Sequence, residues 1–111
     1  MIYTTIYKYS ELLDLEKKYK FIILRYSTEW CSSCLEIKDQ INKFVAELDI
    51  PNTIFVDVDF ESYQEDIDFQ DYIFIDKLPT FYCIDKFKYS GKDLDKIKSL
   101  IISLKDISED F

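Results

Sequence analysis

Two cysteines separated by two residues carry the strongest chemical signal in this chain of 111 residues. They lie in Trp30-Cys31-Ser32-Ser33-Cys34, between an apolar run and a segment of helical periodicity. A sulfur at the start of a helix lies at the positive end of the helix dipole and near unpaired backbone N–H groups, and both stabilise a thiolate. The second sulfur follows about one helical turn later, within reach of a disulfide. This spacing predicts thiol–disulfide exchange with Cys31 as nucleophile and Cys34 as resolving thiol.

The neighbours of the cysteine pair suggest supporting roles. Ser32 and Ser33 allow a tight turn, and the hydroxyl or N–H of each can donate a hydrogen bond to a Cys31 sulfur anion. Trp30 precedes the more exposed sulfur and is predicted to form part of a substrate-binding surface, with burial in the core as the alternative.

A metal site is the main alternative for the cysteine pair. Structural zinc needs four ligands, and the chain has no histidine and only Cys83 beyond the pair, so no metal and no bound cofactor are expected. Cys83 follows Phe81 by two residues in a predicted strand, which favours a small buried hydrophobic residue over a regulatory thiol.

The elements that would position these residues follow from hydrophobic periodicity. The pattern predicts strands at 2–7, 21–26, 53–59, 80–84 and 87–89, and a helix over 10–19 capped by Ser10. Further helices are predicted from the cysteine pair up to Pro51, over the acidic stretch 60–76, whose end could also be extended, and from Leu94 onward. The order β-α-β-α-β-α-β-β-α predicts one α/β domain over 1–111, with a mostly parallel central sheet between two helical layers and an antiparallel hairpin at one edge.

Composition and charge exclude several functions. With 22 acidic and 14 basic residues the net charge is −8, which makes nucleic acid a poor partner. The absence of histidine excludes imidazole-based catalysis, and a single glycine excludes glycine-rich phosphate loops. The first residues lack the features of a secretory leader, and no apolar run is long enough to cross a bilayer. Three cysteines argue against a disulfide scaffold, so a soluble, cytoplasmic protein that does not bind membranes is expected.

Four landmarks in order make the chain resemble the thioredoxin family over nearly its whole length. Residues 28–31, Thr-Glu-Trp-Cys, look like the approach to that family's active site, and residues 56–59, Val-Asp-Val-Asp, resemble its third strand. Residues 78–81, Leu-Pro-Thr-Phe, match its cis-proline segment, and residues 89–91, Tyr-Ser-Gly, match the exit from its last hairpin.

The resemblance implies a thioredoxin-like fold and a protein disulfide oxidoreductase acting in electron transport and redox homeostasis. It implies that Pro79 follows a cis peptide bond opposite the disulfide and that Leu78, Pro79 and Thr80 contact a bound polypeptide. The implied partners are disulfide-containing proteins and a reductase or oxidant that recycles the pair, and the implied state is a monomer.

Departures from the family pattern concern the active site. The dipeptide between the cysteines is Ser32-Ser33 in place of Gly-Pro, and Arg25 occupies the place of the family's buried acid. An arginine there would favour the thiolate and make a stronger oxidant, and the alternative is that Arg25 reaches the surface or pairs with Glu29 or Asp57. The stretch between Asp59 and Pro79 looks longer than in relatives, and its acidic residues could influence the choice of partner.

A second function is compatible with the same fold. The chain could be a redox-inactive module that docks extended polypeptides along the edge at Pro79, with cysteines that do not react. The presence of Trp30, Cys31 and Cys34 together favours the oxidoreductase.

Overall fold

A computed structural model describes residues 1–109, and its five strands form one mixed sheet of order β1-β3-β2-β4-β5. The strands are β1 (Ile2–Ile6), β2 (Phe21–Ser27), β3 (Thr53–Asp59), β4 (Thr80–Cys83) and β5 (Phe87–Ser90). β1 and β2 both run parallel to β3, whereas β4 is antiparallel to β2, and β5 to β4. The predicted mixed sheet with an antiparallel edge hairpin is confirmed.

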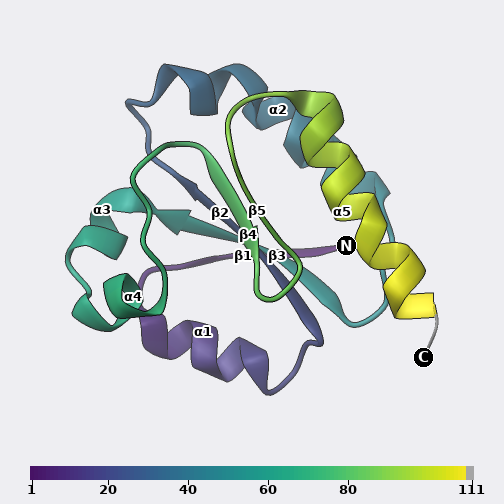
Figure 1. Cartoon of the computed structure of the whole chain (residues 1–111), viewed down its shortest axis with the longest axis horizontal. Helices are drawn as coiled ribbons and strands as arrows, with labels where there is room; N and C mark the ends of the chain where they lie inside the picture. Colours follow the sequence, from purple (N-terminus) through teal and green to yellow (C-terminus); the bar gives the residue numbers. More distant parts are fainter. Residues whose placement is uncertain (110–111) are drawn as a thin grey trace.

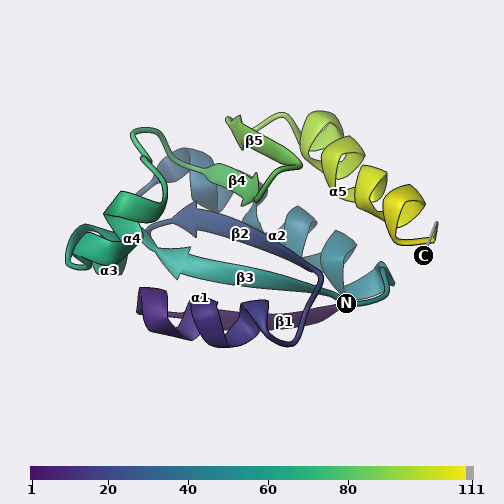
Figure 2. The ribbon, with the colours of Figure 1, turned by 60° about the horizontal axis from the view of Figure 1, so that its bottom comes forward.

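Helices cover both faces of this sheet (Figures 1 and 2). They are α1 (Tyr9–Glu16), α2 (Ser32–Glu47), α3 (Phe60–Gln64), α4 (Ile67–Tyr72) and α5 (Leu94–Glu109). The helices α1, α3 and α4 pack on one face and α2 and α5 on the other, so the predicted three layers are confirmed. Within the described residues, no helix combines the length and apolarity needed to span a membrane.

The central strand β2 explains why the core has two halves. Its side chains alternate, so Leu24 and Tyr26 enter the core below α1, α3 and α4, and Ile23 enters the core below α2 and α5. Six of its seven residues are buried, as expected for a strand covered on both faces. Because β2 and β3 are parallel with Ser27 beside Asp59, the loops that follow them lie at the same edge of the sheet.

Two local predictions were wrong. The helix predicted over 60–76 is two short helices, α3 and α4, and the alternative of an extended end holds from Ile73, after which residues 74–79 contain no helix. The Asp66 side chain accepts hydrogen bonds from the backbone N–H groups of Asp68 and Phe69, which starts a new helix at that point. Ser10 does not cap α1, because the helix begins at Tyr9, where the Glu11 carboxylate accepts from the N–H groups of Tyr7 and Lys8.

Candidate active site

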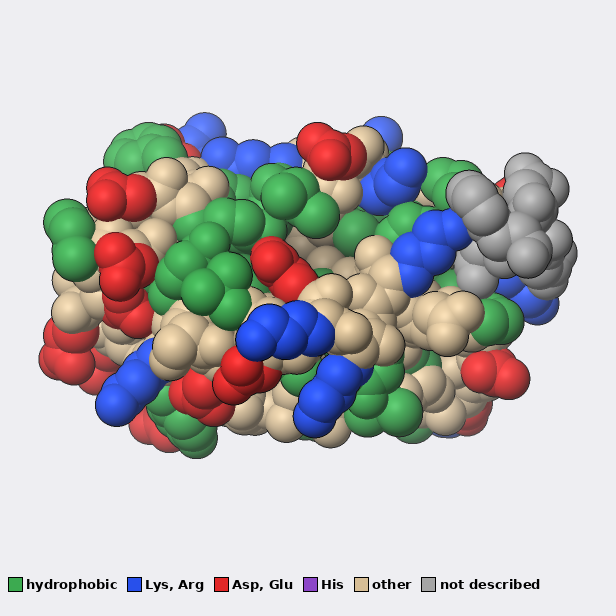
Figure 3. Space-filling model, turned by 90° about the horizontal axis from the view of Figure 1, so that it is seen from below, with side chains coloured by type: hydrophobic (Ala, Val, Ile, Leu, Met, Phe, Trp, Pro, Cys, Tyr) green, Lys and Arg blue, Asp and Glu red, His purple; other side chains and the backbone are tan. Residues whose placement is uncertain are grey.

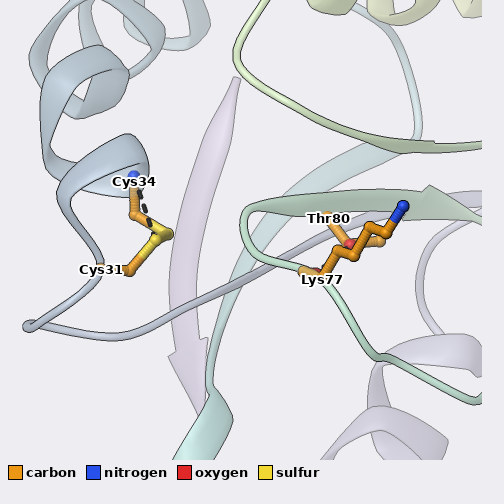
Figure 4. The surroundings of a disulfide bond; sticks show 4 residues. All are labelled: Cys31, Cys34, Lys77 and Thr80. Atoms are coloured by element: carbon orange, nitrogen blue, oxygen red, sulfur yellow. Dashed lines mark hydrogen bonds between the residues drawn. A yellow bond between two sulfur atoms is a disulfide. The ribbon is translucent and has the colours of Figure 1, made fainter.

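The cysteine pair forms a disulfide at the N-terminus of α2, directly after the loop that follows β2 (Figure 4). The Cα atoms of Cys31 and Cys34 are 5.2 Å apart. Cys31 is the N-cap of the helix, and its Sγ accepts a hydrogen bond from the backbone N–H of Cys34 at 3.2 Å. The positive end of a 16-residue helix therefore points at this sulfur, and the first turn contains no acidic residue.

The two sulfurs differ in their access to solvent. Cys31 is partly exposed, whereas Cys34, on the buried face of α2, is 6% exposed. A substrate can therefore approach Cys31 more readily than Cys34, which is almost fully covered and borders only the cleft described below. Among the described residues, the hydrogen-bond donor to Cys31 Sγ is the Cys34 N–H; neither Ser32 nor Ser33 donates in this disulfide form.

A loop before β4 contains a cis peptide bond between Leu78 and Pro79, and Pro79 lines the same cleft as Cys34. The buried Thr80 hydroxyl bonds to the Lys77 carbonyl oxygen at 2.6 Å, which closes the loop (Figure 4), and lies 2.7 Å from the Ser90 hydroxyl. The Thr80 side chain therefore holds the loop in place and is not accessible to a substrate. In the described chain, neither the N–H nor the C=O of Leu78 makes a hydrogen bond, so both are available to a partner.

The single glycine connects this loop to the last hairpin. Gly91 donates its N–H to the Pro79 carbonyl oxygen at 3.0 Å. Its φ is 150°, and a Cβ there would lie 2.7 Å from the Tyr89 hydroxyl oxygen. Any other residue would be strained at this position, so Gly91 allows the hairpin to meet the cis-proline loop.

An ion pair of a buried guanidinium and a partly buried carboxylate lies on the sheet and lines the same cleft as Cys34. Arg25 is 4% exposed and donates from Nε and Nη2 to the two carboxylate oxygens of Asp57, at 2.5 and 2.8 Å. The Tyr3 hydroxyl donates to Asp57 and accepts from Arg25 Nη2, and the guanidinium lies over the Phe55 ring. Arg25 is thus neither at the surface nor paired with Glu29, and the alternative of an Asp57 partner is confirmed.

Burial and pairing act on this pair in opposite directions. Burial raises the pKa of the Asp57 carboxyl and lowers the pKa of the Arg25 guanidinium. The two-pronged contact favours the charged form of both groups. Because the Asp57 charge offsets that of Arg25, the cysteine pair does not lie above an isolated positive charge.

An open cleft of about 560 Å³ lies between the cysteine pair and β1. Its lining includes Cys34, Pro79 and the Arg25–Asp57 pair, with Trp30 and Tyr7 as exposed aromatic rings. Trp30 is 67% exposed, so its alternative placement in the core is wrong, and its indole N–H donates to Glu61 of α3 at 3.0 Å.

The family model that describes thioredoxin matches residues 3–103 of the chain. The chain belongs to the thioredoxin family. A thiol–disulfide oxidoreductase function follows from this membership together with the cysteine pair that forms a disulfide at a helix N-terminus.

Solved thioredoxin structures share the fold at low sequence identity. Reduced thioredoxin pre-protein from Schistosoma mansoni is 20% identical with a TM-score of 0.76, and the match covers 94% of this chain and 99% of that one. Thioredoxin from Fasciola hepatica is 22% identical (TM-score 0.74, covering 92% and 99%), and that from Malassezia sympodialis 20% (TM-score 0.73, covering 95% and 95%). A comparison with the sequences of curated proteins gives no match.

The third cysteine of this thioredoxin-family chain is remote from the chemistry. Cys83 at the end of β4 is a free thiol, 1% exposed, in the core below α2 and α5. Burial raises the pKa of its thiol to about 11, so it stays protonated at neutral pH. The prediction of a buried hydrophobic residue is confirmed. Among the residues described, no three Cys, Asp or Glu side chains are grouped to hold a metal ion.

Two residues that the sequence analysis did not identify complete the surroundings of the site. Tyr3 contacts the ion pair from β1, and Glu61 binds Trp30 from α3. Tyr3 could have been suspected only after the register of β1 against β3 was known, since it lies beside Phe55. Glu61 lies in the first turn of α3, directly after β3, and its contact with Trp30 depends on the ends of β2 and β3 lying side by side.

Proposed function

We propose that Cys31 is the attacking thiolate and Cys34 the resolving thiol in the reduction of protein disulfides. The observation that carries this assignment is the position of the pair, with Cys31 partly exposed as the N-cap of α2 and Cys34 buried one turn later. The N–H that bonds to Cys31 Sγ and the helix dipole both favour a thiolate at this sulfur.

The reaction proceeds in two exchanges. The Cys31 thiolate attacks one sulfur of the substrate disulfide, forming a mixed disulfide and releasing the other substrate sulfur as a thiolate. The Cys34 thiolate then attacks the Cys31 sulfur, which closes the Cys31–Cys34 disulfide and releases the second substrate thiolate. The substrate gains two electrons, and an external dithiol reductant returns them to the pair. An oxidant acting on the reduced pair would drive the same steps in reverse.

Substrate binding is proposed at the surface formed by Trp30 and the cis-proline loop. Trp30 offers an exposed ring beside Cys31, and the free backbone groups of Leu78 can pair with an extended polypeptide over Pro79. Thr80 supports this surface indirectly, since the whole residue is buried and its hydroxyl holds the loop through the Lys77 carbonyl oxygen. Arg25, Ser32 and Ser33 are proposed to modulate the redox potential of the two cysteines. For Arg25 this effect depends on how far the Asp57 carboxylate offsets its positive charge.

The remaining predictions concern the setting of the protein. We propose a single domain over 1–111 that works as a monomer in the cytoplasm, takes electrons from a separate reductase or gives them to an oxidant, and binds neither nucleic acid nor membranes. The acidic net charge supports the exclusion of nucleic acid.

Reduction of insulin with dithiothreitol as the electron source tests the cysteine roles. The unchanged protein should accelerate reduction, Cys31→Ser should abolish the acceleration, and Cys34→Ser should accumulate a mixed disulfide with the substrate. Cys83→Ala is the matched control, since it removes the remaining thiol and should keep the activity. Absence of acceleration over a Cys31→Ser/Cys34→Ser variant would instead favour the redox-inactive binding module.

A further inference from the structure

The net charge of this protein comes from one segment. Residues 57–76 contain eight of the 22 acidic residues and no lysine or arginine. The other 14 acidic residues equal the 14 basic residues in number, so the rest of the chain is neutral overall. The charge of −8 is therefore concentrated in the end of β3, the helices α3 and α4, and the residues that lead to the cis-proline loop.

This acidic segment lies at the edge of the sheet that carries the disulfide. The parallel strands β2 and β3 end side by side, so α3 and the loop before Cys31 occupy the same edge. The hydrogen bond from Trp30 to Glu61 joins the two segments directly. On the face shown in Figure 3, acidic side chains are more numerous at the end of the molecule formed by α3 and α4.

The cleft beside the disulfide combines this charge with aromatic rings. Its lining includes the acidic side chains of Glu29, Asp59 and Glu61 together with the exposed rings of Trp30 and Tyr7. Carboxylates attract a cationic side chain, and aromatic faces bind guanidinium and ammonium groups. Two kinds of group in the same cleft therefore favour the same class of ligand.

The positive charges in the cleft lining do not reverse this preference. The guanidinium of Arg25 is paired with Asp57 and is buried, so its charge is offset where it lies. Lys38 of α2 is exposed on the helical side of the lining. One exposed lysine faces three carboxylates, so the unpaired charge of the lining is negative.

We propose that the preferred substrates are polypeptides that carry lysine or arginine next to the disulfide, with the cationic side chain docking in the cleft beside Trp30. This inference rests on the proposed oxidoreductase function and names its substrate class. The charge of the acidic segment accelerates encounter with such a substrate, and the cleft holds its cation while Cys31 attacks.

The test uses disulfide peptides that differ only in the residues flanking the cysteine, which are lysine, glutamate or serine. The rate constant of the reduced protein with each peptide is divided by the rate constant of dithiothreitol with the same peptide. This ratio removes the intrinsic effect of the flanking charge on the leaving thiol. We expect the normalised rate to be on the order of tenfold higher for lysine than for glutamate at low salt. The difference should shrink at about 0.5 M salt, where the Debye length falls to a few ångströms.

Two variants with the same change in net charge locate the effect. The first replaces exposed acids of the acidic segment, as Glu61→Gln, Glu65→Gln, Asp68→Asn and Asp71→Asn, and leaves the helix-capping Asp59 and Asp66 intact. The second replaces exposed acids away from that edge, as Asp14→Asn, Glu47→Gln, Asp49→Asn and Asp85→Asn. The first variant should lose the preference for lysine, and the second should keep it.

The possible outcomes separate this inference from the function on which it rests. A preference absent from the unchanged protein, or reduced equally in both variants, overturns the proposal while the serine-flanked peptide is still reduced. Failure to reduce any of the three peptides contradicts the cysteine roles instead. Loss of the preference in the first variant alone supports docking of a cation at the active-site edge.

Discussion

The sheet face below α2 and α5 has two ends, and each accommodates its polar groups differently. At the end near the disulfide, Arg25 and Asp57 lie on neighbouring strands and neutralise each other beside an open cleft. At the other end, the Cys83 thiol lies among apolar side chains such as Phe21 and Ile101. The first end holds the buried Arg25 charge because Asp57 pairs with it, and the second suppresses charge by burial, which raises the pKa of Cys83.

This difference explains why only one end can exchange disulfides. Cys31 lies at a helix N-terminus, accepts an N–H hydrogen bond and is partly exposed. Cys83 lacks this access, and burial disfavours its thiolate more than the Ile22 N–H and the Lys86 charge favour it. The fold thus keeps a reactive and an inert sulfur in the same chain, and the surroundings decide between them.

Removing one member of the ion pair should give the largest effect on stability. Arg25→Met leaves the partly buried Asp57 carboxylate without its partner, and we expect the free energy of unfolding in urea to fall by about 3 kcal/mol. At the apolar end, Cys83→Ala removes a small neutral group, for which about 1 kcal/mol is expected.

The double variant Arg25→Met/Asp57→Leu provides the control for this prediction. It removes both charges and should recover most of the lost stability, because no unpaired charge remains. A double variant as unstable as Arg25→Met alone would show that packing around Arg25, and not its charge, sustains this end of the sheet.

The pH dependence of stability reports on the buried Cys83 thiol at the apolar end of the sheet face. Because the pKa of Cys83 is about 11 in the folded protein against an ordinary value of about 9, the unfolded chain loses this proton first as the pH rises. The contribution of Cys83 to stability is complete below pH 9 and decreases between pH 9 and 11. At pH 10 the loss is about 1.4 kcal/mol.

Urea unfolding of the oxidised protein and of Cys83→Ala at pH 8 and pH 10 measures this loss, since the Cys31–Cys34 disulfide does not titrate. The difference between the two proteins should change between these pH values by the amount given. An equal response of both proteins to pH would contradict the idea that burial keeps this thiol protonated.

The sequence was informative wherever a short motif determines its own geometry. The cysteine spacing at the start of α2, the cis bond before Pro79 and the burial of Cys83 were each predicted and are present. In these cases the neighbouring residues impose the arrangement, or the family resemblance implied it, and no distant contact had to be known.

Predictions failed or stayed open where a distant contact decides the outcome. The Asp66 side chain both caps α4 and accepts from the Tyr9 N–H of α1, which no periodicity in residues 60–76 reveals. The partner of Arg25 stayed open between Glu29 and Asp57 because the choice depends on strand register. In the sheet Arg25 lies beside Asp57, and that register settles it.

The smallest predicted effect on stability concerns Tyr3, whose hydroxyl contacts the Arg25–Asp57 ion pair from β1. Tyr3 is 45% exposed, so water can replace its hydroxyl at Asp57 and Arg25 once the hydroxyl is removed. Tyr3→Phe should therefore lower the free energy of unfolding by about 1 kcal/mol, well below the loss for Arg25→Met.

The matched control is Tyr7→Phe. Tyr7 is an exposed tyrosine of the same cleft whose hydroxyl makes no hydrogen bond within residues 1–109, so this change should alter stability by less than about 0.5 kcal/mol. A loss for Tyr3→Phe as large as that for Arg25→Met would mean that the hydroxyl is a required partner of the buried charges. The group of residues that neutralises these charges would then include Tyr3 of β1, and not only Arg25 of β2 and Asp57 of β3.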